Sequence, residues 1–208
     1  MKRALLWIVA TTLLTALVLA GQFQRLLEPG PDVLSDLGYF AFGEPRALPS
    51  IGLVDHERRS VRLDEGGGQW TLVFFGFTAC PDVCPTTLSI INLAFENSPD
   101  APAVIMVTLD PERDTPDLLQ GYVQSFNPHF RGLTGSPDAV QRLTDELHIA
   151  FEKVPTGELP GQYTIAHSGA LVVLDPDGRF AGYIRPPLHE AQLREIYRTL
   201  ADATGRSP

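Results

Sequence analysis

The stretch Gly76–Leu88 reads Gly-Phe-Thr-Ala-Cys-Pro-Asp-Val-Cys-Pro-Thr-Thr-Leu and decides the fold. It holds the only two cysteines of the chain, Cys80 and Cys84, directly after the apolar run Trp70–Phe77. Proline at the first position of a helix loses no hydrogen bond, so Pro85 is expected to begin a helix with Cys84 as its N-cap. The stretch therefore predicts a buried strand, a short loop with two thiols and a helix start.

The unpaired N–H groups and partial positive charge of a helix N-terminus favour a thiolate, which attacks disulfides and binds metals. Three interpretations of the cysteine pair stay open. The pair could form a structural disulfide, although so small a loop constrains the unfolded chain little. It could be a redox pair, one residue longer than Cys-x-x-Cys. It could supply two soft ligands to a metal such as Cu(I), with a third ligand from elsewhere.

The composition describes one acidic globular domain with a targeting segment. The chain has 208 residues, 44% of them hydrophobic, which is enough for a substantial core. Its formal net charge of −9 argues against nucleic acid as a partner, because phosphate binding needs a basic surface. The same charge favours a partner with a basic face.

The N-terminus has the pattern of a transmembrane anchor. Lys2 and Arg3 precede an uncharged apolar run over 4–21, which as a helix would span about 27 Å. Positive residues stay cytoplasmic, so the domain is expected on the exported, periplasmic-type side. A cleaved signal peptide is the alternative, because Val18-Leu19-Ala20 resembles a cleavage site, and cleavage would release a soluble form. Either way the domain meets an oxidising compartment.

We divide the chain into residues 1–21, the anchor or signal segment; 22–47, a tether rich in proline and glycine; and 48–208, the globular domain. Phe40 and Phe42 of the tether are candidates for docking on the domain.

The patterns within the domain predict an α/β fold. The continuous apolar run Thr71–Phe77 is typical of a strand covered on both faces. Thr115-Pro116-Asp117 and Ser136-Pro137-Asp138 each combine a cap, a first-position proline and an acidic residue, so each begins a helix. Further strands are expected at 102–109, 170–174 and 179–184, further helices at 84–97 and 188–203, and a β-hairpin at 51–55 and 60–63.

Parallel strands joined by helices, and closed by an antiparallel hairpin and a helix, form a three-layer α/β sandwich. Ligands of such sheets bind beyond the carboxyl ends of the strands, which is where Cys80 and Cys84 lie.

Several segments together resemble the Sco/SenC family of thioredoxin-fold copper metallochaperones. They are Phe75–Pro85, with its Cys-Pro-Asp-Val-Cys-Pro core, Leu109–Pro116, Gly132–Ser136, His167-Ser168 and Leu174–Gly178. The resemblance extends from about residue 48 to about residue 203, and an N-terminal anchor is typical of the family. It implies a thioredoxin-like three-layer sandwich with an N-terminal β-hairpin addition and a transmembrane anchor.

The resemblance also implies a function. Family members bind one copper ion per chain and help to assemble the dinuclear copper A centre of cytochrome c oxidase, by delivering copper, by reducing cysteines of the target, or both. Residue by residue, Cys80 and Cys84 match the thiolate ligands and His167 the imidazole ligand. The partners implied are the oxidase subunit that bears copper A, other copper carriers and thioredoxin-like reductants. Ala166 is a departure, because relatives often carry an acidic residue there that could support the histidine.

The donor chemistry agrees with copper. Thiolate favours Cu(I), and imidazole extends the range to Cu(II). Zinc accepts the same donors, but structural zinc sites require four ligands. The alternative from another class is an enzyme, a membrane-tethered thiol–disulfide oxidoreductase that uses Cys80 and Cys84 to keep partner cysteines reduced. A redox or copper sensor is a third hypothesis, which the lack of a separate output domain disfavours.

The remaining polar candidates are interpreted as structural. Four histidines lie in or beside expected turns or helix ends and are expected to face solvent: His56, His129, His148 and His189. The charged segment Asp110–Asp114 is expected to form a turn and a helix start. In the functional alternative, Asp110 lies near the metal site and adjusts the thiols, and the same applies to Asp82.

Overall fold

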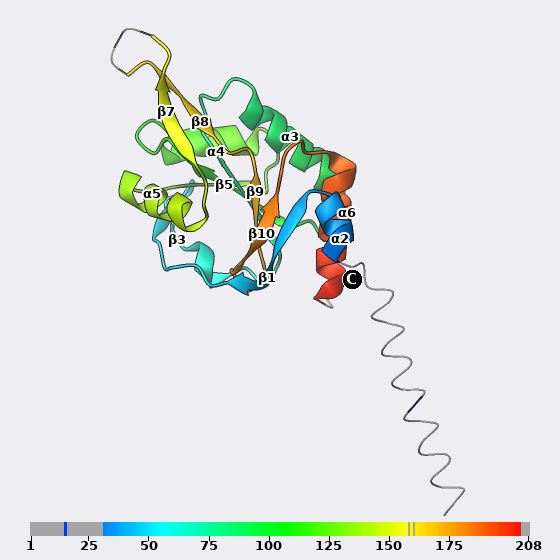
Figure 1. The fold of residues 1–208 in the computed structure, drawn as a ribbon. Coiled ribbons are helices and arrows are strands. Elements are labelled where there is room, and N and C mark those ends of the chain that lie inside the picture. Colours follow the sequence, from blue (N-terminus) through cyan, green and yellow to red (C-terminus); the bar gives the residue numbers. More distant parts are fainter. Residues whose placement is uncertain (1–14, 16–30, 158, 160, 205–208) are drawn as a thin grey trace, which may run out of the picture.

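The chain folds around one mixed β-sheet with helices on both faces (Figure 1). The structure, a computed structural model, describes residues 15, 31–157, 159 and 161–204. Within this part, eight strands form a sheet in the order β1-β10-β9-β4-β5-β6-β2-β3, and a separate two-stranded sheet pairs β7 with β8.

The strands are β1 (Tyr39–Arg46), β2 (Leu53–Asp55), β3 (Ser60–Val61), β4 (Thr71–Gly76), β5 (Ala103–Thr108), β6 (Arg131–Thr134), β7 (Phe151–Pro155), β8 (Tyr163–His167), β9 (Leu171–Leu174) and β10 (Phe180–Ile184). The helices are α2 (Pro31–Asp36), α3 (Val83–Phe95), α4 (Pro116–Gln124), α5 (Pro137–Glu146) and α6 (Glu190–Ala203), with a 3₁₀ turn, η1, at Leu63–Glu65.

Strand β4 lies at the centre of the sheet, and all six of its residues are buried. It pairs in parallel with β5, and β5 pairs in parallel with β6. Right-handed crossovers that step the same way along a sheet place their helices on one face, so α3 and α4 share a face. Helix α6 packs against α3, and α5 covers the opposite face (Figure 1). The expected three-layer α/β architecture is confirmed.

Both helix starts that the sequence marks are confirmed. The hydroxyl of Thr115 accepts a hydrogen bond from the backbone N–H of Leu118, and that of Ser136 accepts one from Ala139. These caps satisfy N–H groups that a helix start leaves unpaired.

The expected start of the cysteine helix is wrong by two residues. Helix α3 begins at Val83 with Asp82 as its N-cap, so Cys84 lies in the first turn and is not the cap. The first four N–H groups of a helix have no partner within it, so Pro85 is tolerated as the third helical residue as well as at the first.

The expected tether over 22–47 is wrong for residues 31–36, which form helix α2, and for residues 39–46. This segment forms β1 at the edge of the sheet, where it pairs antiparallel with β10. Pro45 fits there because an edge strand leaves one row of N–H groups unpaired. Phe42 docks on the domain, as expected, with its ring 4.7 Å from that of Phe180 in an edge-to-face contact. Phe40 is 39% exposed, and the guanidinium group of Arg185 stacks on its ring at 4.0 Å.

Strand β6 and the β7–β8 hairpin were also not expected. Strand β6 is only four residues long, too short for its pattern to stand out. The β7–β8 hairpin projects from one corner of the body (Figure 1), and β7 is mostly exposed. An exposed hairpin shows no clear apolar alternation, so the sequence did not reveal it.

The expectation for His56 is also wrong. Its side chain is buried, and its Nδ1 atom accepts a hydrogen bond from the backbone N–H of Gly132 at 2.9 Å. The N–H of His56 donates to the carbonyl of Gly132, so the turn after β2 is held against β6. His129, His148 and His189 are exposed, as expected.

No helix in the described part of the chain is both long and apolar enough to cross a membrane. The expected anchor over 1–21 lies outside the described residues, apart from Thr15.

Candidate metal centre

The cysteine loop connects the carboxyl end of β4 to the start of α3. The backbone N–H of Cys80 donates to the carbonyl of Phe77 at 3.2 Å, which closes a tight turn after the strand. The N–H of Cys84, unpaired within the helix, points at the sulfur of Cys80 at 3.4 Å. The first turn of the helix therefore directs a backbone N–H group at the outer sulfur.

The third expected ligand, His167, comes from a segment that is distant from the cysteines in sequence. His167 is the last residue of β8. Its Nε2 atom lies 3.7 Å from the sulfur of Cys84. The two sulfur atoms and the imidazole nitrogen all lie within 4.8 Å of one another. The structure therefore brings together Cys80, Cys84 and His167, and neither cysteine is in a disulfide.

Burial keeps the inner donors uncharged in the metal-free protein. Cys84 is fully buried, and this desolvation, with the neighbouring Cys80 as a smaller cause, raises the pKa of its thiol far above the usual range. Desolvation also lowers the pKa of His167, and its hydrogen bond to Ser168 opposes this only in part. The imidazole is therefore a free base at neutral pH, and a metal ion must displace the Cys84 proton to bind.

The orientation of the imidazole is set by its neighbour in sequence. Nδ1 of His167 lies 2.9 Å from the carbonyl oxygen of Ser168, and a carbonyl can only accept, so Nδ1 carries the proton. The lone pair of Nε2 then faces Cys84, which is the arrangement a metal ligand needs. Ala166 is exposed and pairs with Glu152 across the hairpin, so the Ser168 carbonyl is the partner of the ring here.

Apolar groups close the inner side of the site. The rings of Phe74 and Phe77 meet the imidazole edge-to-face, with centroids 6.0 and 6.1 Å from it. Gly76 leaves room for the inner sulfur, because a Cβ atom there would come within 2.9 Å of the sulfur of Cys84. Such walls exclude water and strengthen the bond between a thiolate and a cation.

The outer side of the site opens to solvent. Cys80 and His167 line a shallow depression of about 320 Å³, together with Pro81, Asp82, Val83 and residues 164–166. Asp82 is exposed in this rim and hydrogen-bonds only weakly to Thr86 at 3.5 Å. Cys80 and His167 therefore line the open side of the cluster, whereas Cys84 lies on its inner side.

A buried acidic network beside the site was not predicted in full. Asp110 and Asp114, expected to form a turn and a helix start, are both almost completely buried. Asp114 accepts hydrogen bonds from the backbone N–H and hydroxyl of Thr78 and from the hydroxyl of Thr108. A run of charged residues directly after an apolar strand marks this segment in the sequence, but no local pattern marks its two aspartates as buried.

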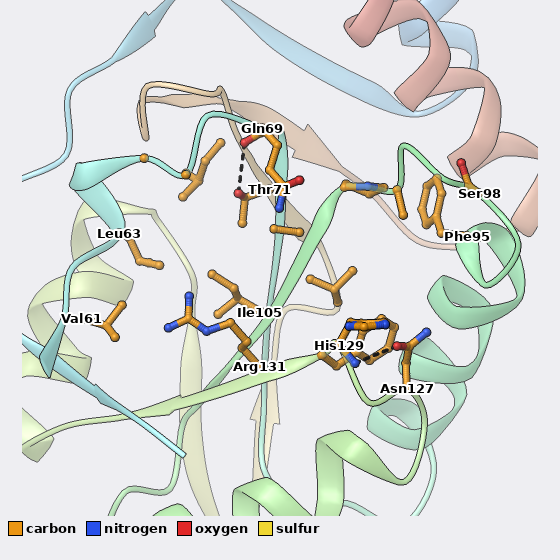
Figure 2. Close-up of a pocket in the computed structure, with 18 of the residues that line it drawn as sticks. Val61, Leu63, Gln69, Thr71, Phe95, Ser98, Ile105, Asn127, His129 and Arg131 are labelled. Carbon is orange, nitrogen blue, oxygen red and sulfur yellow. Dashed lines mark hydrogen bonds between the residues drawn. The ribbon is translucent and has the colours of Figure 1, made fainter. Parts of the chain in front are cut away.

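A larger cavity, of about 670 Å³, lies at the amino ends of β4, β5 and β6, away from the cysteines. Figure 2 shows Ile105 in its wall between Arg131 and Thr71. Its arginines already have partners, because Arg131 pairs with Asp55 and Arg62 with Asp64. It contains none of the expected ligands.

Comparison with known proteins agrees with this geometry. A protein of Stutzerimonas stutzeri described as copper-binding is 39% identical over 161 residues, which cover 76% of this chain and 78% of that protein. The structure of copper-bound ScoI from Bradyrhizobium japonicum has a TM-score of 0.62 and 32% identity, over 76% of this chain and 98% of the other. Apo Sco1 from Thermus thermophilus has a TM-score of 0.66 and 33% identity, over 78% and 95%.

Fold and site together define a thioredoxin-like domain with a cluster of two thiols and one imidazole at the end of its sheet. The SCO1/SenC family model matches residues 45–202. The chain belongs to the SCO1/SenC family.

Proposed function

We propose that this protein is a copper metallochaperone, which carries one copper ion on Cys80, Cys84 and His167 and assists assembly of the copper A centre of cytochrome c oxidase. The observation that carries the proposal is the meeting of two sulfurs and one imidazole nitrogen within 4.8 Å. Soft sulfur donors suit Cu(I), and the neutral imidazole suits Cu(II), so this donor set fits copper in both oxidation states.

The geometry also fits a carrier rather than a permanent structural site. Three donors leave a coordination position open, whereas structural zinc sites are closed by four. Cys80 and His167 face the surface depression, while Cys84 is fully buried. A partner thiol can therefore approach the ion from the side of Cys80, and the acceptor is the oxidase subunit that bears copper A.

Copper titration of the full-length, pre-reduced chain in detergent tests the binding step. We expect one copper per chain and an intense thiolate-to-copper absorption band for Cu(II). Cys80→Ser and Cys84→Ser should lose the band, and His167→Ala should weaken Cu(II) binding. His129→Ala removes an exposed histidine and is the matched control. Weak binding without the band would overturn the proposal.

The delivery step has its own test. The copper-loaded chain is mixed with a reduced, copper-free copper A domain, and the absorption of the assembled dinuclear centre is followed. We expect the wild type to build the centre and the Cys80→Ser variant to fail. If the copper-free chain, with Cys80 and Cys84 as thiols, instead reduces the disulfide of an oxidised copper A domain and becomes oxidised itself, and if the His167→Ala variant does so equally well while neither delivers copper, the protein acts as a thiol–disulfide oxidoreductase, the alternative function.

We place the domain on the exported side of a membrane, held by residues 1–21. The support is the pair Lys2 and Arg3 before an uncharged apolar run. Fractionation of cells that produce the full chain tests this: the protein should stay with membranes in high salt and be digested by protease added from the exported side. Release into the soluble exported fraction would indicate a cleaved signal peptide instead.

A further inference from the structure

The segment Asp110–Asp114, which joins β5 to α4, contains two buried carboxylates that are not among the proposed copper ligands. Asp110 and Asp114 are 0% and 1% exposed. The segment is a tight turn, because the backbone N–H of Asp114 donates to the carbonyl of Asp110 at 2.8 Å. Burying two carboxylates is unfavourable unless each is satisfied by donors, so their partners are informative.

The partners of Asp114 belong to the cysteine loop and the neighbouring strand. Asp114 accepts from the backbone N–H of Thr78 at 3.0 Å and from its hydroxyl at 2.5 Å. A third bond comes from the hydroxyl of Thr108, the last residue of β5, at 2.5 Å. Thr78 lies two residues before Cys80. Asp114 therefore holds the loop at the point where it leaves β4, with charge-assisted bonds.

The partners of Asp110 lead to the histidine strand. The hydroxyl of Tyr163 donates to Asp110 at 2.8 Å, and Arg113 forms an ion pair with the same carboxylate. Arg113 also donates to the carbonyl of Tyr163 at 3.3 Å, and its guanidinium group stacks on the tyrosine ring at 3.8 Å. Tyr163 is therefore held through its backbone carbonyl, its hydroxyl and its ring.

Tyr163 and His167 are the first and last residues of β8. Residues four apart in a strand point to the same face, and at ~3.4 Å per residue they lie about 14 Å from each other. The β7–β8 sheet is separate from the main sheet, so pairing with the central strands does not position it. The contacts of Tyr163 with Asp110 and Arg113 instead anchor β8, the strand that carries His167.

We infer that the turn Asp110–Asp114 is a positioning device for the copper site. We call its two sets of contacts arms. In the Asp114 arm, Asp114 binds Thr78 and positions the cysteine loop. In the Tyr163 arm, Asp110 and Arg113 bind Tyr163 and position β8, the strand that carries His167. The inference rests on the proposed copper function and adds the residues that set the distance between its sulfur and nitrogen donors. None of these residues is among the proposed ligands.

The two arms have separable consequences. Two thiolates suffice for Cu(I), which accepts low coordination, whereas Cu(II) depends on the imidazole. Loss of the Tyr163 contacts should therefore weaken the binding of Cu(II) selectively. Loss of the Asp114 contacts should weaken the binding of both Cu(I) and Cu(II), because both ions need the cysteine pair.

The test measures Cu(II) and Cu(I) affinities of full-length variants by competition with chelators, together with the Cu(II) absorption and electron paramagnetic resonance spectra. Tyr163→Phe removes the bond to Asp110 but keeps the ring under Arg113, and Thr78→Val removes the hydroxyl bond to Asp114. Tyr183→Phe is the matched control, because it loses a hydroxyl that binds the carbonyl of Leu147 at 2.8 Å.

For Tyr163→Phe we expect Cu(II) affinity to fall about tenfold and the spectra to shift, as for other groups that orient ligands, while Cu(I) affinity changes less than about threefold. For Thr78→Val we expect both affinities to fall. Amide exchange of copper-free Tyr163→Phe should accelerate over 165–168, a readout that needs no copper. Asp110→Asn keeps an acceptor for the Tyr163 hydroxyl, so its Cu(II) affinity should lie between those of Tyr163→Phe and wild type.

Wild-type spectra and affinity in Tyr163→Phe, with unchanged amide exchange, would overturn the inference. An equal loss of affinity for Cu(I) and Cu(II) in Tyr163→Phe would also overturn the inference, since general unfolding weakens both equally. If the wild type itself failed to bind copper, the proposed function would fail first, and the amide exchange alone would then show whether the turn anchors β8.

Discussion

The sulfur of Cys84 lies 3.7 Å from Nε2 of His167, although the two residues are 83 positions apart in the sequence. Both groups are neutral at this contact, because burial raises the pKa of the thiol and lowers the pKa of the imidazole. The metal-free site therefore holds no buried charge that would have to be compensated. A soft cation that displaces the thiol proton gains both donors at once.

The packing around Cys84 predicts a large effect of Gly76→Ala. A Cβ atom at this position would lie 2.7 Å from the ring of Phe74 and 2.9 Å from the sulfur of Cys84. We expect a loss of about 1–3 kcal/mol of stability from overpacking, with weaker copper binding. Urea unfolding of the copper-free chain measures the first effect and copper titration the second.

Gly121→Ala is the control for this change, because a Cβ atom there meets nothing within 4 Å. Alanine is favoured over glycine within a helix, so this variant should gain about 0.5–1 kcal/mol. A Gly76→Ala protein as stable as wild type would show that the core around Cys84 has room to spare.

The buried carboxylate of Asp55 predicts a loss of stability in acid. Burial alone raises its pKa, but hydrogen bonds from Arg59 and Arg131 outweigh this and hold the pKa below its usual value. The unfolded chain then binds the proton more tightly, so the stabilisation is complete above about pH 4 and is lost as the pH falls further.

Asp55→Asn should cost about 1.5–3 kcal/mol at pH 7, the range for hydrogen bonds to a charged group. It should also flatten the decline of stability between pH 4 and pH 3, measured by urea unfolding. An equally steep acid decline in the variant would assign the effect to other carboxylates.

The buried imidazole of His56 predicts a second pH effect, at higher pH. Desolvation lowers its pKa, while its Nδ1 atom accepts from Gly132. The folded protein therefore resists protonation, and stability should fall as the pH drops below about 6.5, by at most ~1.4 kcal/mol per pH unit for one proton.

His56→Asn keeps an acceptor near Nδ1 but does not titrate. Its stability should change less between pH 7 and pH 5 than that of wild type, as measured by thermal unfolding. His167 contributes to the same window in both proteins, so the difference between them reports His56. Identical pH dependence would mean that His56 is protonated equally in the folded and unfolded chains.

Two buried or half-buried tyrosines predict opposite responses to loss of the hydroxyl. The Tyr122 hydroxyl is buried and has no hydrogen-bond partner among the described residues, so Tyr122→Phe should be neutral or stabilising. The Tyr183 hydroxyl binds the carbonyl of Leu147 at 2.8 Å, so Tyr183→Phe should cost about 0.5–1.5 kcal/mol. Chemical denaturation distinguishes the two, and a larger loss in Tyr122→Phe would reveal a partner for its hydroxyl.

Much of the fold could be predicted because its signals are local. The apolar run of β4 and the caps at Thr115 and Ser136 act through neighbours in sequence, and all three were identified correctly. Strand β1 was missed because Pro45 and its exposed residues look like a linker. Only its pairing with β10 makes it a strand, and no local pattern records that pairing.

The candidate site divides in the same way. The spacing of Cys80 and Cys84 pointed to sulfur chemistry at the end of a strand, whereas His167 was selected from five histidines by resemblance to a family. The burial of Asp110 and Asp114 could not be read from the sequence, because charged residues between a strand and a helix are usually exposed.

The sequence by itself determined the central strand, the helix starts and a pair of thiols at the end of the sheet, because these depend on residues a few positions apart. Only the tertiary structure decided which imidazole meets the thiols, which carboxylates are buried and which nitrogen of His167 is free. Those outcomes depend on contacts between distant segments, where burial and hydrogen-bond geometry set the charge and orientation of each group.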